Sequence, residues 1–250
     1  MIRFPRLTIL VVSVLLILSA SAEPTPKLNS IMRQHIEAMG GLTNWSRVES
    51  IRLAGTVERD GQTVDIVIVK KRPEKIRATV TVPISEKEGE YLQLIRAHDG
   101  TNAWTATRLA GAAETPKTEL TGQDAQDLLA DAGVVPRLFK LWRTNKPLHY
   151  TGSGTFKGIN VHIIEFEDTA NAAHHRFYLS AKSYRTLGYE TRTEEKTVVT
   201  RLSAYKEKEG VFIPTYSEIT TEGTGRSVIR IRSIQVGVGI YADYFRGAPD

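Results

Sequence analysis

The feature that most constrains the fold is a two-residue alternation of apolar and polar side chains that begins at Ser50. Ile51, Leu53 and Val57 lie on one side of this pattern, and Asp60-Gly61 then forms a tight-turn signal. Because successive side chains of a strand point to opposite faces, the pattern predicts a strand that enters a hairpin. Similar short segments, separated by turn residues, recur along the chain and are typical of an antiparallel sheet.

The expected strands form two groups, with about five before residue 110 and seven after residue 147, which makes about 11–12 in all. The predicted ranges are 50–58, 64–69, 75–82, 91–98, 103–108, 148–157, 159–168, 174–180, 185–194, 197–206, 211–221 and 226–236. The chain has no internal repeat and no linker rich in proline or serine. Residues 23–250 are therefore expected to form one domain.

A helix is expected before the strands, over Lys27–Met39. Its apolar residues repeat at the three- and four-residue spacing that places them on one helical face. Gly40-Gly41 follows, and glycine readily takes the left-handed conformation that ends a helix.

Residues 121–145 interrupt the strands and predict two short helices. The first begins at a capping-box-like sequence, Thr121–Asp124, and carries Leu128 and Leu129 before Gly133. The second has Pro136 in its first turn, where the missing N–H costs nothing. Its apolar residues include Leu138, Phe139 and Trp142.

A long antiparallel sheet must cover one of its faces. With one helix at the start and two in the middle, the sequence predicts a mostly β (α+β) fold. We expect an incomplete antiparallel β-barrel with an N-terminal helix and a helical lid or plug. The interior of such a barrel can hold an apolar ligand.

The first 22 residues predict a cleaved secretory signal peptide. Arg3 and Arg6 precede an apolar run over Leu7–Leu18, and Ala20-Ser21-Ala22 is a small-residue cleavage site. The alternative is an uncleaved N-terminal anchor, although the run is shorter than the roughly 20 residues that span a membrane. An exported chain without cysteine fits a bacterial envelope, so we expect a periplasmic location.

Composition excludes several classes of function. Without cysteine the chain has no thiol nucleophile, no disulfide and no cysteine-ligated metal. Removal of the first 22 residues lowers the net charge from +5 to +3, and no Lys/Arg block stands out, so no nucleic-acid partner is expected. The serine-hydrolase elbow, the zinc-protease motif and the phosphate-binding loop are also missing.

Two weaker arrangements of residues could support chemistry. His174 and His175 are adjacent in a strand, so they face opposite ways and do not easily share a metal. Glu165 and Glu167 share a face and could act as an acid–base pair, although exposed acids on a strand are commoner. We therefore expect a protein that is not an enzyme, with no catalytic residues, no metal and no cofactor.

Two motifs support a family resemblance. Val69–Arg77, which contains Lys71-Arg72-Pro73, resembles a stretch of LolA-like proteins, the periplasmic lipoprotein carriers. Asp99–Trp104 looks like the turn that joins two strands in that family, and Ile36–Gly41 is similar to a wider group of exported relatives. The chain is longer than a typical carrier, which bears on carrier activity more than on fold.

The resemblance implies a hydrophobic cavity that receives acyl chains of a lipoprotein or lipid under a helical lid. It also implies that Arg72 keeps the lid closed through hydrogen bonds to the lid helices; a surface cation is the alternative. Besides Arg72, the residues expected to contact the ligand are Leu53, Ile66, Ile68, Trp104, Leu128, Leu129, Leu138, Phe139 and Trp142. A core role is the alternative for each apolar residue.

The leading hypothesis is thus a monomeric periplasmic carrier that binds an acylated lipoprotein or a lipid and performs no covalent chemistry. An inner- or outer-membrane protein could be its partner. The alternative is an envelope module for protein interaction or lipid sensing that docks a membrane regulator. An enzyme of unrecognised type is a third hypothesis, which a cluster of histidine and acidic side chains inside the cavity would favour.

Overall fold

The computed structural model describes residues 26–87 and 89–247, so the expected signal peptide at 1–22 lies outside the described residues. The helices are α1 (Pro26–Ala38), α2 (Gly41–Arg47), α3 (Gly122–Asp131), α4 (Arg137–Arg143) and a short 3₁₀ helix, η1 (Ala242–Phe245). In residues 26–87 and 89–247, no helix is both long enough and apolar enough to span a bilayer.

The strands form one antiparallel sheet of 13 members. Their bounds are β1 (Ser50–Arg59), β2 (Gln62–Lys71), β3 (Lys75–Pro83), β4 (Tyr91–His98), β5 (Ala103–Leu109), β6 (Thr118–Leu120), β7 (Leu148–Phe156), β8 (Ile159–Asp168), β9 (Ala173–Ser180), β10 (Thr186–Arg192), β11 (Thr197–Lys208), β12 (Val211–Thr221) and β13 (Gly225–Val236).

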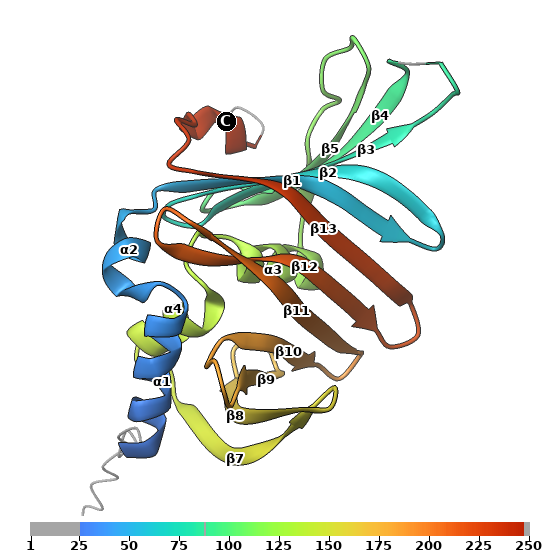
Figure 1. The fold of residues 1–250 in the computed structure, drawn as a ribbon. Coiled ribbons are helices and arrows are strands. Elements are labelled where there is room, and N and C mark those ends of the chain that lie inside the picture. Colours follow the sequence, from blue (N-terminus) through green and yellow to red (C-terminus); the bar gives the residue numbers. More distant parts are fainter. Residues whose placement is uncertain (1–25, 88, 248–250) are drawn as a thin grey trace, which may run out of the picture.

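The strand order explains why the helices lie where they do. The sheet runs β6-β5-β4-β3-β2-β1-β13-β12-β11-β10-β9-β8-β7, so two meanders meet where β1 pairs with β13. The chain therefore leaves the sheet at one edge, β6, and re-enters at the other, β7. Helices α3 and α4 make this connection, and Figure 1 shows the sheet curving around α3 without closing into a barrel.

The predicted fold class is confirmed: the protein is mostly β, with an open, curved antiparallel sheet and a helical connection. The helix and all 12 expected strands are present with small shifts at their ends. The sequence did not predict α2, β6 or η1, each of which is shorter than eight residues. Such short elements carry little periodic signal, and packing decides whether they form.

We call the side of the sheet that faces α3 and α4 the inner face and the opposite side the outer face. The register fixes which residues share a face. Lys70 lies opposite Ile51 on β1 and opposite Ile76 on β3, while Ile68 lies opposite Leu53. All five therefore belong to the inner face.

Two glycines allow close approaches that shape the sheet and its helical cover. At the bulge between β1 and β13, a Cβ on Gly55 would lie 2.0 Å from the Arg230 carbonyl oxygen. Gly40, between α1 and α2, has φ +109°, and a Cβ there would lie 2.2 Å from the Gly210 carbonyl oxygen. Bulges bend a strand and increase its twist, which supports the curvature of this sheet.

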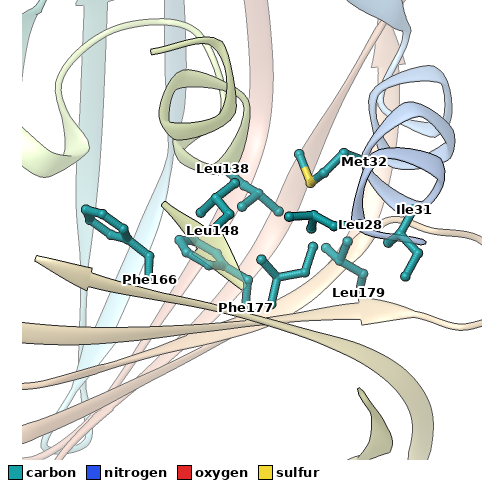
Figure 2. Close-up of a cluster of buried hydrophobic side chains, with 9 residues drawn as sticks. Leu28, Ile31, Met32, Leu138, Leu148, Phe166, Phe177 and Leu179 are labelled. Atoms are coloured by element: carbon teal, nitrogen blue, oxygen red, sulfur yellow. The ribbon is translucent and has the colours of Figure 1, made fainter. Parts of the chain in front are cut away.

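The main core lies where α1 and α4 pack on the inner face of β7–β9. Figure 2 shows side chains from α1, α4 and the strands pointing toward one another. The cluster consists of Leu28, Ile31, Met32, Leu138, Leu148, Ile164, Phe166, Phe177 and Leu179. It fixes α1 and α4 at one end of the curved sheet.

A second core joins α2 to the centre of the sheet. It contains Ile36, Met39, Trp45, Val48, Ile51, Val134, Phe139, Val211 and Ile213. Phe139 is fully buried, with its ring edge-on to His35 at 5.1 Å and to Trp45 at 6.4 Å between centroids. Helix α4 is thus held by buried aromatic contacts as well as by the main core.

Candidate functional site

A cavity of about 280 Å³ lies between the inner face and the α3–α4 connection. Ligand pockets usually measure roughly 300–1,000 Å³, so this one is at the small end. Most of its lining is apolar and comes from the strands where the two meanders meet, together with the loop after α3. The apolar lining includes Leu53, Ile68, Val134, Val135, Leu138, Phe177, Leu202, Ile213, Ile219, Ile229 and Ile231.

Three charged residues interrupt this apolar lining: Lys70 on β2, Asp131 at the end of α3 and Arg137 at the start of α4. Lys70 is half-buried, and its ammonium forms no hydrogen bond or salt bridge with any described residue. Burial lowers the pKa of Lys70, and the Asp131 carboxylate opposes that shift. Asp131 is exposed, so the two opposite charges differ in their access to solvent.

Two tyrosines contribute phenol groups to the cavity wall. Burial raises the pKa of Tyr189 to about 12, so its hydroxyl is neutral at physiological pH. Burial also raises the pKa of Tyr205, whose hydroxyl donates to the Thr186 carbonyl at 2.6 Å. Neither group adds charge to the cavity.

Arg137 is positioned by His175 on β9. The Arg137 Nη2 atom donates to His175 Nε2 at 3.0 Å, because a guanidinium has no acceptor. His175 Nδ1 then carries the ring proton and donates to Thr191 Oγ1 at 3.0 Å. Burial, with Arg137 as the next cause, lowers the pKa of His175 to about 4, so the imidazole is neutral.

The two helices of the connection are held very differently. No residue of α3 is buried, and its charged contacts are Asp124 with Arg96 at 3.1 Å and Asp127 with Lys196 at 3.6 Å. Exposed ion pairs of this kind contribute roughly 0–1 kcal/mol each. Helix α4, in contrast, buries Leu138 and Phe139. The cavity is therefore covered by one weakly held helix and one anchored helix.

A second cavity of about 380 Å³ lies between α3, α4 and the inner face of the strands β8–β12. It shares Ala130, Asp131 and Arg137 of the helical connection, and Tyr189, Thr200 and Ile219 of the sheet, with the first cavity. Movement of α3 alone would join the two spaces, because the shared residues include the end of that helix.

The structure brings together part of the predicted ligand-contact set. Leu53, Ile68 and Leu138 line the first cavity. Ile66 is buried on the same face but outside the lining, and Leu129, half-buried on α3, lines the second cavity instead.

Three predicted residues of the connection lie elsewhere in the packing. Phe139 belongs to the second core, and Trp142 packs against both cores. Leu128 is half-buried on α3 and lines neither cavity. Of this group, Phe139 and Trp142 support the cover of the cavity and do not form its wall.

Trp104 lies on the outer face, away from the cavity. It packs with Ile95, Ala97 and Ala106, and its indole Nε1 donates to the Phe245 carbonyl at 2.9 Å. Figure 1 shows the C-terminal segment on this side of the sheet. Trp104 thus holds the C-terminal segment. The prediction that places Trp104 in the cavity is corrected, since this residue does not line it. Sequence alternation separates two faces but does not say which one is covered by the lid.

Arg72 bonds a different helix from the one expected. Its Nε donates to the Val48 carbonyl and its Nη2 to the Trp45 carbonyl, both at 2.8 Å. Both carbonyls lie at the C-terminal end of α2: Val48 is its cap residue, and the Trp45 carbonyl also accepts from the Val48 N–H at 3.2 Å. Arg72 and Glu74 lie in the loop between β2 and β3. This loop contacts the helical connection through an ion pair of Glu74 with Lys140 on α4. The expected hydrogen bonds from Arg72 to the lid helices are therefore corrected.

Lys70, Asp131 and Arg137 were not predicted as site residues. A signal for Lys70 was available, because the alternation that places Ile66 and Ile68 on one face places Lys70 there too. No comparable signal marks Asp131 or Arg137, since their place depends on how the connection crosses the sheet.

The histidines and acids of β8 and β9 lie on two faces: His175 lines the second cavity, whereas His174, Glu165 and Glu167 cluster on the opposite face. His174 Nε2 lies 3.7 Å from Glu165 and 3.4 Å from Glu167, and Arg176 pairs with Glu165 at 2.6 Å. Within residues 26–87 and 89–247, no group of three or more histidine, aspartate and glutamate residues could hold a metal ion.

Comparison with solved structures finds similar folds, and two of them match most of this chain. A DUF1329 family protein from Desulfovibrio piger is 11% identical, with a TM-score of 0.55 over 87% of this chain and 96% of that one. A LolA superfamily protein from Nitrosomonas europaea is 12% identical, with a TM-score of 0.56 over the same shares. The chain has a LolA-like fold. At these identities the similarity shows the fold alone. No family model matches the sequence, and neither does any curated protein.

Proposed function

We propose that this protein is an exported, periplasmic carrier that binds the acyl part of a lipid or lipoprotein and performs no covalent chemistry. The observation that supports this proposal is the apolar cavity between the inner face and the α3–α4 connection. Burial of an acyl chain would stabilise the complex by roughly 0.8 kcal/mol per methylene. The LolA-like fold is compatible with such a role, but a fold by itself does not establish a function.

Ligand entry is proposed to occur by displacement of α3. This helix buries no residue and is held by exposed ion pairs, so its displacement costs little. Helix α4 stays in place because Leu138 and Phe139 anchor it. In this respect the lid of the proposed carrier is a single helix, with Gly133 at φ +85° in the loop that joins it to α4.

The test is native mass spectrometry of the protein purified from its own envelope, followed by denaturation and lipid extraction. A stoichiometric acylated compound is expected in the wild type. Ile68→Trp, which fills the cavity, should remove it, whereas Thr79→Trp on the outer face of neighbouring β3 should retain it. A protein that is empty, and stays empty after incubation with lipoprotein and phospholipid, would contradict the proposal and favour the interaction module.

A further inference from the structure

We propose that the cavity selects an acyl compound with a carboxylate at one end, and that Lys70 binds this carboxylate. The inference rests on the proposed function and names its ligand class. The first observation is the position of the Lys70 ammonium. Lys70 is the inner-face residue of β2 that follows Ile66 and Ile68, and its strand neighbours Ile51 and Ile76 are both 4% exposed.

An ammonium in such surroundings needs a partner. Burial of a charge is costly unless hydrogen bonds or an opposite charge compensate it. The Lys70 ammonium makes no hydrogen bond and no salt bridge within residues 26–87 and 89–247, and Asp131 acts on it only at longer range. A lysine that only supported the core would be expected to have a partner at contact distance. This one instead lines a cavity.

The charge balance of the lining favours an anion. Lys70 and Arg137 supply two positive charges, and Asp131 supplies one negative charge. The hydroxyls of Tyr189 and Tyr205 stay neutral because burial raises the pKa of both phenols. An anionic ligand therefore meets a net positive lining.

Size and charge together favour a singly charged head on one chain. If a methylene occupies about the volume of a water, roughly 30 Å³, a cavity of about 280 Å³ holds about nine chain carbons. The Asp131 carboxylate at the rim would repel a doubly charged phosphate more than a carboxylate. The proposed ligand is thus a medium or long single-chain carboxylate, with any further carbons extending toward the second cavity.

The experiment compares decanoate with 1-decanol, which has the same chain length and no charge, by isothermal titration calorimetry on the whole protein. Decanoate should bind more tightly than 1-decanol. Lys70→Met should weaken decanoate binding by about 10- to 100-fold, the usual range for a lost hydrogen bond to a charged group, and should weaken 1-decanol binding much less, because the alcohol offers the ammonium only a neutral hydroxyl. The control is Lys206→Met, an exposed lysine on β11, which should change neither.

A second variant tests the same charge argument if Lys70→Met does not fold. Asp131→Asn removes the acid from the rim and should tighten decanoate binding more than 1-decanol binding. A third ligand, decyl phosphate, tests the head group, and tighter binding of decyl phosphate than of decanoate would overturn the carboxylate assignment.

The two proposals fail in different ways. If 1-decanol and decanoate bind equally and neither variant separates them, the carboxylate site is refuted while acyl binding stands. If neither compound binds, and the purified protein also carries no acylated compound, acyl binding itself is refuted and the carboxylate site with it.

Discussion

Replacement of Phe139 by alanine tests the claim that α4 is an anchor and α3 a movable cover. Phe139 is fully buried, with 0% of its surface exposed to solvent, and the rings of His35 and Trp45 pack against it. Leu129 on α3 provides the matched comparison, since it is apolar but only half-buried. The two substitutions remove apolar side chains from the two halves of one connection.

The expected costs differ several-fold. Truncation of a buried phenylalanine to alanine lowers the free energy of unfolding by about 3–5 kcal/mol. Full burial of a leucine is worth roughly 1.5–3 kcal/mol, so a half-buried one should lose about 1 kcal/mol. At about 2–4 °C per kcal/mol for a domain of this size, Phe139→Ala should lower Tm by roughly 6–20 °C and Leu129→Ala by roughly 2–4 °C.

The assay is urea denaturation of both variants, with hydrogen exchange of the wild type as a second readout. In exchange, amides of α3 should open at a lower free energy than those of α4, because weakly packed elements open locally. Equal costs for the two substitutions, or equal protection of the two helices, would refute the division into anchor and cover. Lower exchange protection in α4 than in α3 would reverse the assignment of anchor and cover.

The remaining predictions concern pH, the sheet and Arg72. Burial lowers the pKa of His35 from 6.5 to about 4, so between these values the unfolded chain binds a proton that the folded chain does not. His35 should therefore lower stability by up to roughly 3 kcal/mol as pH drops from 6.5 to 4, and His35→Leu should reduce the pH dependence of denaturation across this range while the part due to His175 remains. Gly55→Ala should lower the free energy of unfolding by about 1–3 kcal/mol, because the added Cβ forces β1 away from β13. The control, Gly239→Ala, has open space around it and should stay within about 0.5 kcal/mol of wild type in denaturant unfolding. A similar loss in both variants would contradict the close approach at Gly55. Arg72→Leu should lower the unfolding free energy by about 2 kcal/mol through loss of its two bonds to α2, and an unchanged midpoint would show that these bonds contribute nothing.

Much of the local structure could be predicted because its signals are local. Strands such as β4 (Tyr91–His98) and β8 (Ile159–Asp168) were bounded correctly, since alternation and turn residues are both encoded within a few positions. The same holds for α1, whose apolar face repeats over 13 residues. In contrast, α2 has seven residues and one buried side chain, Trp45, so its formation depends on the core that it enters.

The candidate site was predicted less completely because its members come from distant parts of the chain. Leu53, Ile68 and Leu138 line the cavity, and their contact with a ligand stays a prediction. The face that holds Trp104 and the partner of Arg72 depend on contacts that no local pattern encodes. Trp104 reaches its partner Phe245 across 141 positions of sequence. Such contacts form only once both segments are folded.

The sequence by itself determined the class of the fold: period-two segments, glycine turns and one helical interruption leave a curved antiparallel sheet as the way to cover one face. Tertiary structure decided which face is inner, through the pairing of β1 with β13 and the crossing of α3 and α4 between the two edges of the sheet. That crossing brings Asp131 and Arg137 to the same cavity as Lys70, together with apolar residues from distant strands. The physical reason is that alternation fixes relative faces, whereas long-range pairing and burial fix where each face points.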